Sequence, residues 1–260
     1  MTVVTENDLE GARGVMRIRV PGGMITYFWG FWSLGKYIKS KRKIYMLFFL
    51  ISLLQSILEV SRQHIIVYFV LSMLLLLYNS SLIKKCILVG SIFMVYNFVL
   101  PHIRIYQMLM DYTELQKEKT DDFRENVRVG AAIYYIKDFH QSAYTILMGN
   151  GRAHSESTYG IRMERIMYNL GYILADIGFV GIYIYFGIVG ILFYLYLLYW
   201  TFKQKESLEY KGIQYFVFFL YLTNIISNAF ISSTLILPVS LYLLHNSFNK
   251  KIYSLSEVVK

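Results

Sequence analysis

The chain has 260 residues, of which 56% are hydrophobic and 17% are aromatic, and its formal net charge is +9. This composition excludes an ordinary soluble domain, which carries more charged and fewer large apolar side chains. The single cysteine, Cys86, excludes an internal disulfide and has no Cys or His at a metal-ligand spacing. We therefore predict an integral membrane protein without a metal or cofactor, whose partner is a lipid bilayer and not a nucleic acid.

Seven apolar runs follow one another along the chain, separated by polar or basic segments. They are Met24–Ile38, Ile44–Leu58, Ile65–Tyr78, Cys86–Leu100, Gly171–Tyr199, Ile213–Ile226 and Leu235–Leu244. Because the runs do not alternate apolar and polar residues, and because backbone in lipid must satisfy its own hydrogen bonds, they are predicted to be helices. The predicted fold is all-α, a polytopic helical membrane protein with about seven transmembrane helices. Residues 1–260 form one membrane domain, and residues 102–170 form a long loop within it.

The positions of the basic residues predict how the seven runs are oriented in the membrane. The clusters at 36–43, 80–85, 203–211 and 250–260 all fall on one side, which the positive-inside rule assigns to the cytoplasm. The N-terminus, the turn at 59–64 and the 102–170 loop are then outside, and the C-terminus is cytoplasmic.

The two sides differ in the type of basic residue. The cytoplasmic side holds twelve Lys and one Arg, whereas the outer side holds ten Arg and three Lys. Membrane topology does not distinguish the two residue types, but phosphate recognition does, because guanidinium matches phosphate oxygens bidentately. The outer side is therefore predicted to bind a pyrophosphate. The structural alternative is that these arginines pair with the acidic residues of the same loop.

Several short motifs follow one another in a recognisable order. Ser61-Arg62 ends a polar turn before the third run, and Arg128 opens a helical Val-Gly-Ala-Ala-Ile segment. An Ile-Leu-x-Gly-x-Gly turn covers residues 146–151, and Tyr-Ile-Leu-Ala-Asp-Ile-Gly-Phe-Val-Gly covers 172–181. In this order the chain resembles the O-antigen polymerase and ligase superfamily over most of its length. Members usually have more spans, so this chain is expected to lack the N-terminal ones. The ligase histidine is replaced by Met-Tyr-Asn at 167–169, which favours a polymerase.

The resemblance implies a glycosyltransferase of the bacterial inner membrane that joins lipid-linked oligosaccharide repeat units. A glycan on undecaprenyl pyrophosphate would be transferred to the next lipid-linked repeat, building O-antigen, capsular polysaccharide or exopolysaccharide, with a chain-length regulator as a further partner. The leaving pyrophosphate needs positive charge. Arg62 and Arg128 are the catalytic candidates for this role, and Arg124, Arg162 and Arg165 are candidates for binding substrate.

The acceptor hydroxyl needs a group that takes its proton. Asp176 is the catalytic candidate, and His154 and Glu156 are the candidates beside it in the substrate site. Structural readings stand beside these predictions: a membrane-surface anchor for Arg62, an ion pair with Arg165 for Asp176, and a loop histidine for His154. The alternative functions are an O-antigen ligase, a transporter of lipid-linked sugars and an inactive fragment.

Overall fold

The computed structural model describes residues 23–59, 61–78, 80–81, 83, 90, 107, 127–140, 142–204, 208–225, 227–233 and 235–258. Regular structure in these residues is entirely helical, which confirms the all-α fold class. Six of the seven predicted apolar runs lie largely in this part of the chain, and each of them is helical over most of its length. The remaining run, Cys86–Leu100, lies almost wholly outside it.

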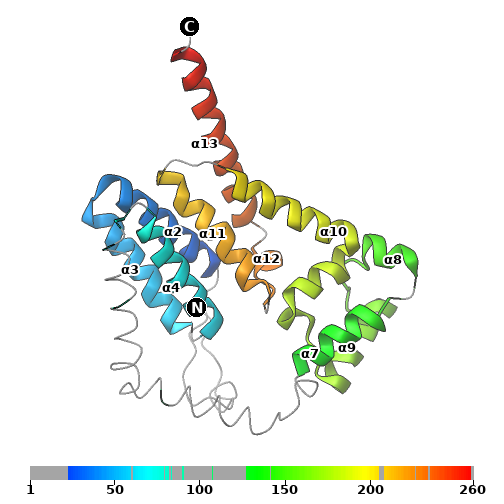
Figure 1. Cartoon of the computed structure of the whole chain (residues 1–260). Helices are drawn as coiled ribbons and strands as arrows, with labels where there is room; N and C mark the ends of the chain where they lie inside the picture. The colour runs from blue at the N-terminus through cyan, green and yellow to red at the C-terminus, as the bar shows by residue number, and fades with distance from the viewer. Residues whose placement is uncertain are drawn as a thin grey trace.

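Four helices form a bundle at one side of the molecule (Figure 1). α2 (Gly23–Ser40) and α3 (Lys43–Leu58) make a tight antiparallel hairpin, and α4 (Arg62–Leu77) and α11 (Leu208–Thr223) pack against α2. Apolar side chains recur on every side of these helices, so each can bury one face and still present another to its surroundings.

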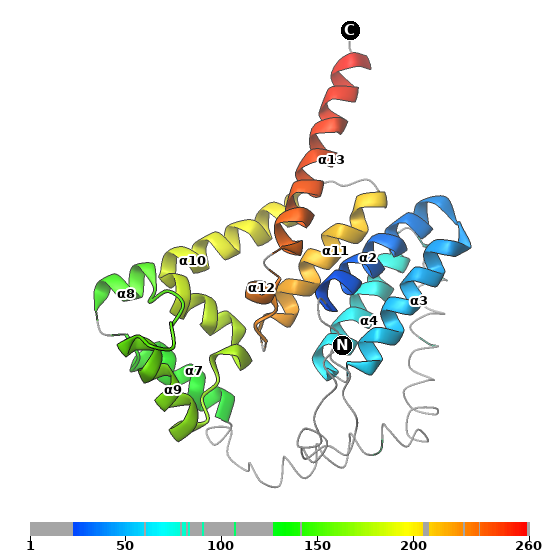
Figure 2. The same cartoon turned by 180° about the vertical axis from the view of Figure 1, so that it is seen from behind.

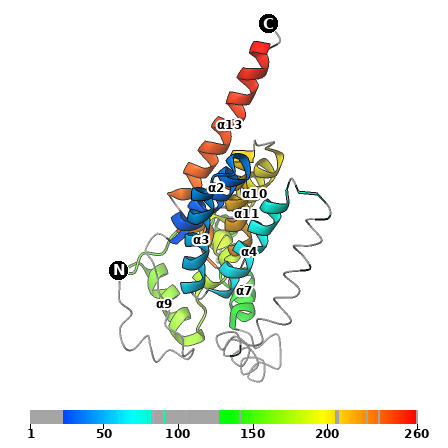
Figure 3. The ribbon, with the colours of Figure 1, turned by 90° about the vertical axis from the view of Figure 1, so that its left-hand side faces the viewer.

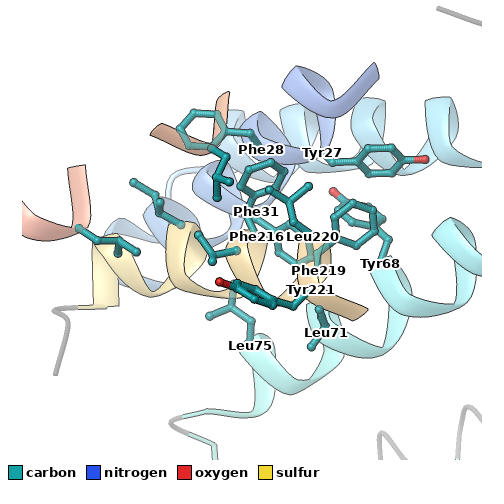
Figure 4. Close-up of a cluster of buried hydrophobic side chains, with 14 of the residues drawn as sticks. Tyr27, Phe28, Phe31, Tyr68, Leu71, Leu75, Phe216, Phe219, Leu220 and Tyr221 are labelled. Atoms are coloured by element: carbon teal, nitrogen blue, oxygen red, sulfur yellow. The ribbon is translucent and has the colours of Figure 1, made fainter. Parts of the chain in front are cut away.

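Aromatic rings fill the centre of this bundle (Figure 4). Phe31 lies 4.8 Å from Tyr68 and 5.8 Å from Phe219, measured between ring centroids. The Tyr68 hydroxyl donates a hydrogen bond of 3.0 Å to Ser52 Oγ. Any side chain at Gly30 would overlap both hydroxyl groups, so this glycine is what lets α2 approach α3 and α4 closely.

The bundle also buries polar side chains among its apolar ones, and it exposes apolar side chains along several helices. Fully buried hydroxyl and amide side chains include Ser33, Ser72, Gln214, Thr223 and Asn224. The outer face of α3 exposes about half of each side chain of Leu47, Leu50, Ile51, Leu54 and Ile57. An exposed apolar face of this kind is typical of helices that meet lipid or another apolar surface.

α10 (Gly178–Lys203) is bent sharply in the middle, as its V shape in Figure 1 shows. Gly187 has φ 64° and ψ −160°, a conformation that is essentially restricted to glycine. The turn at 149–151 follows the short helix α8 (Ala143–Met148) and fills the break. The amides of Asn150 and Gly151 donate to the carbonyls of Ile184 (2.8 Å) and Tyr185 (3.1 Å), which the broken helix leaves without their usual partners.

A second group of helices surrounds the first half of α10. Figures 1 and 2 both show α7 (Val127–Lys137), α8 and α9 (Thr158–Leu170) gathered there, on the side away from α2, α3 and α4. We call residues 127–177 the lobe. The lobe has its own apolar core with the first half of α10: Ala131, Tyr135, Phe139, Ile166, Leu174, Ile177 and Ile184. The long predicted loop thus contains folded helices where the structure describes it.

The helices alternate in direction, which gives the molecule two distinct ends. At one end lie the α2–α3 connection and the start of α11, where Lys211 stacks on Tyr78 at the end of α4. At the other end lie the start of α4, α7 and α9 (Figure 1). α12 (Ala229–Ser232) follows α11, and α13 (Ile236–Val258) then runs back and projects beyond the lysine-bearing end (Figures 1 and 3).

Within the described residues, α10 meets the length and composition of a membrane-crossing helix. α3 and residues 63–77 of α4 are shorter apolar helices of 10–17 residues. A core helix of a soluble protein can meet the same requirement, so this finding by itself does not establish seven spans. The fifth predicted segment also differs from the prediction, because Asp176 lies in the short 3-10 helix η4 (Leu174–Asp176) before α10 and not within the long helix.

Candidate functional site

The arginines predicted to bind pyrophosphate lie on α7 and α9 of the lobe. Arg128 is exposed in the first turn of α7, and Arg165 is exposed on α9. The Arg162 guanidinium stacks 4.7 Å from the centroid of the Phe139 ring. Arg162 is therefore already held by an aromatic face, an arrangement that leaves the edge of the planar fork open to an anion.

His154 and Glu156 belong to the turn that starts α9. Ser157 is the N-cap of this helix, because its Oγ accepts a hydrogen bond from the Gly160 amide at 2.9 Å. The Glu156 amide donates to His154 Nδ1 at 3.3 Å, and Ser157 Oγ donates to the His154 carbonyl at 2.7 Å. Both predicted binding side chains are exposed. One nitrogen of His154 is thus engaged in the turn, which agrees with the structural reading of this residue as a loop histidine.

Asp176 is partly exposed at the junction between the lobe and α10. Its neighbours Leu174 and Ile177 are buried in the lobe core and fix the position of its backbone. The ion pair between Asp176 and Arg165, which is the structural alternative for both residues, is not formed in the described part of the chain. The predicted proton acceptor is therefore not neutralised by Arg165.

Two predicted site residues cannot be followed as side chains. Arg124 lies outside the described residues. Arg62 is the first residue of α4, and the structure describes its place in the helix only. Figures 1 and 2 both place the start of α4 and the start of α7 at the same end of the molecule. The helices that carry Arg62 and Arg128 thus begin at a common end.

The structure adds a cluster that the sequence analysis did not include. Glu59 ends α3, and its Oε2 accepts a 2.5 Å hydrogen bond from the Tyr27 hydroxyl of α2. His64 Nδ1, in the first turn of α4, lies 3.9 Å from the same oxygen. We call Tyr27, Glu59 and His64 the bundle-end cluster. A carboxylate, an imidazole and a phenol from three helices therefore meet beside the first turn of α4.

The His64 ring is held by packing and not by hydrogen bonds. Its centroid lies 5.8 Å from those of Tyr27 and Phe219. Both ring nitrogens are buried and have no hydrogen-bond partner in the described part of the chain. Gln55 Nε2, one turn before Glu59, is also buried and has no hydrogen-bond partner among the described residues. An unsatisfied buried polar group costs about 1–3 kcal/mol, so this concentration of them calls for a functional explanation.

Gln63 fixes the backbone on which this cluster stands. Its side-chain amide donates to the carbonyls of Thr223 (2.7 Å) and Leu222 (3.2 Å), the last residues of α11. The start of α4 is thereby fastened to the end of α11. The residue before Gln63 is Arg62, so the backbone of this predicted catalytic arginine is also held in place.

Burial changes the acid–base properties of two rings in the lobe. Burial lowers the pKa of His140, whose Nδ1 lies 3.4 Å from the side-chain nitrogen of Asn150. Burial, aided by Tyr185 and opposed by Arg162, raises the pKa of Tyr159 to about 12. His140 is therefore favoured in its neutral form, and the Tyr159 hydroxyl keeps its proton at neutral pH.

The described residues thus offer guanidinium groups, carboxylates and imidazoles at one end of the molecule. They contain no group of three or more His, Cys, Asp or Glu side chains that could hold a metal ion. Such a set can neutralise an anionic leaving group and accept a proton. No protein-family model matches the chain, and neither a curated protein nor a solved structure is significantly similar to it.

Proposed function

We propose that the protein is a polysaccharide polymerase of the bacterial inner membrane. It transfers a growing glycan from undecaprenyl pyrophosphate to the next lipid-linked repeat unit. The observation that carries the proposal is the contrast between the two ends of the helix bundle, because lysines gather at one end and the arginine-bearing lobe lies at the other. A chain-length regulator is a partner in the same proposal.

The polarity of the bundle supports placing it in a membrane. The α3 face that contains Leu47, Leu50 and Leu54 is exposed, whereas Gln214 and Thr223 are buried. Buried amides and hydroxyls hold helices together where no hydrophobic effect does so, as in lipid. We extend this to seven spans, with the helices alternating in direction across the bilayer. A 16-residue helix such as α4 is about 24 Å long at ~1.5 Å per residue, so local thinning or tilt accompanies the shorter spans.

The arrangement of charge supports an anionic lipid substrate. Lys36, Lys39, Lys41 and Lys43 lie at the end opposite to α7 and α9. The positive-inside rule gives this end to the cytoplasm, which leaves Arg128 and its neighbours on α9 to face the periplasm. Guanidinium is suited to a diphosphate leaving group there because it stays charged and binds two oxygens in one plane.

A transporter of lipid-linked sugars is the second candidate, and the break in α10 favours it. Transporters commonly bind their substrates at discontinuous helices, whose freed backbone groups contact the ligand. In α10 the carbonyls of Ile184 and Tyr185 are already bonded to the 149–151 turn. A transporter that used these carbonyls would therefore have to release the 149–151 turn before its ligand could bind.

Replacement of Arg128 tests the polymerase in the native bacterium. Surface polysaccharide is separated by gel electrophoresis, and chain lengths are compared for the wild type, Arg128→Ala and Arg128→Lys. We expect Arg128→Ala to abolish long chains while single repeat units persist, and Arg128→Lys to restore them in part, since lysine is a point charge without the fork. Lys137→Ala, an exposed residue on the same helix, is the matched control.

The outcomes separate the candidate functions. A normal ladder of chain lengths in Arg128→Ala would overturn the assignment of this residue, and a normal ladder in cells without the gene would overturn the polymerase. Loss of single repeat units from the outer surface together with the long chains would favour the transporter. Proteoliposomes then decide directly, because only a transporter moves a fluorescent lipid-linked repeat across the bilayer without joining it to another.

A further inference from the structure

We propose that α8 (Ala143–Met148) lies within the bilayer, where its exposed side chains contact lipid acyl chains. The sequence analysis placed residues 102–170 outside the membrane as a whole, so this inference moves one part of that loop into lipid. It rests on the membrane placement of the helix bundle in the proposed function, and it does not depend on glycosyl transfer. It is carried by the depth of α8 and by the character of its surface.

α8 lies beside the bend of α10, between the two ends of the molecule. Figures 1 and 2 both show it level with the body of the helix bundle, whereas α7 and α9 extend to the end at which α4 begins. The attachment to α10 is close, because a Cβ on Gly187 would overlap the Leu147 carbonyl and come within 2.6 Å of the Gly149 amide nitrogen. The depth of α8 is therefore set by the depth of the bend.

The length of α10 beyond its bend limits that depth. Residues 188–203 run from the bend to the lysine-bearing end of the molecule, and this half of the helix is at most about 24 Å long at ~1.5 Å per residue. The hydrocarbon core of a bilayer is about 30 Å thick. With Lys203 at the cytoplasmic boundary, the bend and α8 lie inside the hydrocarbon core, and any tilt of α10 moves them farther from the outer surface.

The surface of α8 is apolar and exposed. Tyr144 is 71% exposed, Leu147 is 46% exposed and Met148 is 48% exposed. Residues 139–151 contain no Asp, Glu, Lys or Arg, whereas charged residues stand directly before and after this stretch, at 137–138 and at 152. Exposed apolar side chains that are gathered in this way mark an interaction surface.

The neighbouring part of α10 needs the same kind of cover. Phe186 and Val189, close to the bend, are 53% and 46% exposed, and Leu192 and Phe193 are about as exposed farther along the helix. Within the described residues, α10 is also the helix whose length and composition suit a membrane span. Lipid acyl chains cover a span on all of its free sides, so they are the occupant that this arrangement favours for α8 as well.

The backbone around α8 pairs its polar groups within the protein, as backbone inside lipid must. Ser142 and Thr145 form a capping box at the start of the helix, in which Ser142 Oγ accepts from the Thr145 amide at 3.3 Å. At the other end, the Gly149 amide donates to the Thr145 carbonyl at 2.9 Å, and the next two amides donate to carbonyls of α10. These groups can therefore leave water without losing their partners.

The test measures the depth of single positions in the full-length protein, reconstituted in phosphatidylcholine vesicles. In a Cys86→Ser background, Leu147→Cys on α8, Leu54→Cys on α3 and Glu164→Cys on α9 each receive a bimane fluorophore. All three positions are exposed in the structure. Lipids with brominated acyl chains quench the fluorophore from within the bilayer, and iodide quenches it from water.

We expect brominated lipid to reduce the emission at residue 147 as strongly as at residue 54, which reports the lipid-facing side of the bundle. Iodide should leave the emission at both positions nearly unchanged. Residue 164 is the control in water and should show the opposite pattern. Tyr144→Cys, in the same helix as residue 147, should repeat the result of Leu147→Cys, and it replaces that variant if Leu147→Cys does not fold.

Each outcome supports or overturns the inference. Quenching of residue 147 by iodide, with residue 54 still quenched by lipid, overturns it alone and places α8 in water. Quenching of residue 147 by neither reagent also overturns it, because a protein surface then covers α8, and a disulfide between two Leu147→Cys chains would identify that surface as a second copy. Quenching of residue 54 by iodide and not by lipid overturns the membrane placement of the bundle together with this inference. The experiment measures no joining of repeats, so failure of the polymerase in the Arg128→Ala experiment is distinguished from failure here.

Discussion

Gly149 and Gly187 face each other across the break in α10, and each occupies the space that a side chain on the other's segment would need. Gly149 has φ 81° and ψ 178°, and Gly187 has φ 64° and ψ −160°. A Cβ on Gly187 would come within 3.0 Å of the Leu147 carbonyl and the Gly149 amide. A Cβ on Gly149 would come as close to the backbone of Tyr185. The two glycines therefore form one structural unit.

Gly187→Ala should destabilise the protein by about 1–3 kcal/mol, because alanine strongly disfavours this conformation and overlaps the 149–151 turn. Thermal unfolding of the detergent-solubilised protein measures the loss, and proteolysis should cut the freed turn first. Gly181→Ala is the control on the same helix, since a Cβ there meets only ordinary contacts at 3.6 Å or more. Equal stability of the two variants would contradict the interlocked arrangement.

Tyr194 and Tyr221 join α10 to α11 by exchanging hydrogen bonds. Tyr194 Oη donates to the Tyr221 carbonyl at 3.3 Å, and Tyr221 Oη donates to the Tyr194 carbonyl at 3.0 Å. Each change to Phe should cost about 0.5–1.5 kcal/mol of unfolding free energy. The double variant should lose less unfolding free energy than the two single variants lose together. Removing one hydrogen bond already weakens the other. Full additivity in chemical denaturation would show that the two bonds act independently.

His140 should make the lobe sensitive to acid. Burial lowers its pKa in the folded protein below the ordinary value of 6.5, so the unfolded chain binds a proton more readily. The stability that neutral His140 contributes is complete above its pKa in the unfolded chain. It is lost as the pH falls through its lower pKa in the folded protein. Proteolysis of the 138–151 region should therefore accelerate as the pH falls from about 8 to about 5, which is about one and a half units on either side of the ordinary histidine value of 6.5. His140→Gln should flatten this dependence, and an unchanged slope would contradict it.

Cysteine labelling tests the proposed topology. Cys86 is the single cysteine, so a Cys86→Ser background accepts one new cysteine at a time. Glu156→Cys in the lobe and Lys41→Cys at the α2–α3 connection are both exposed positions. A membrane-impermeant maleimide added to intact spheroplasts should label residue 156 and leave residue 41 unlabelled until the cells are lysed. Labelling of both positions from outside would contradict the alternation of helices across a bilayer.

The helices were predictable because their cause is local. Each apolar run, such as Ile44–Leu58, has the length and composition of a buried or lipid-facing helix, and the structure places α3 at Lys43–Leu58. The break at Gly187 cannot be predicted from the sequence, because glycines spaced along an apolar helix are equally typical of sites where another helix packs closely. That interpretation suits Gly178, where a Cβ would strike the Ser227 carbonyl. Gly187 depends instead on a turn almost forty residues earlier in the chain.

The bundle-end cluster escaped prediction for the same reason. Glu59 and His64 lie in a polar break between two apolar runs, and within that break the sequence motif indicates only Arg62 as a candidate. Tyr27, the donor to the carboxylate, is 32 residues before Glu59. The spacing of Tyr27 and Glu59 in the sequence does not predict their contact. A carboxylate and an imidazole within six residues at the end of an apolar helix were the available signal, since ionisable groups there are costly and tend to be functional.

The 149–151 turn couples any movement of the lobe to movement of α10. Two of its amides complete the backbone bonding of α10, so the lobe cannot move away alone without removing the partners of the Ile184 and Tyr185 carbonyls. Any movement of the lobe that keeps these two hydrogen bonds must carry the first half of α10 with it. The close contact of Gly178 with the turn after α11 then limits how far that unit can shift at its other end.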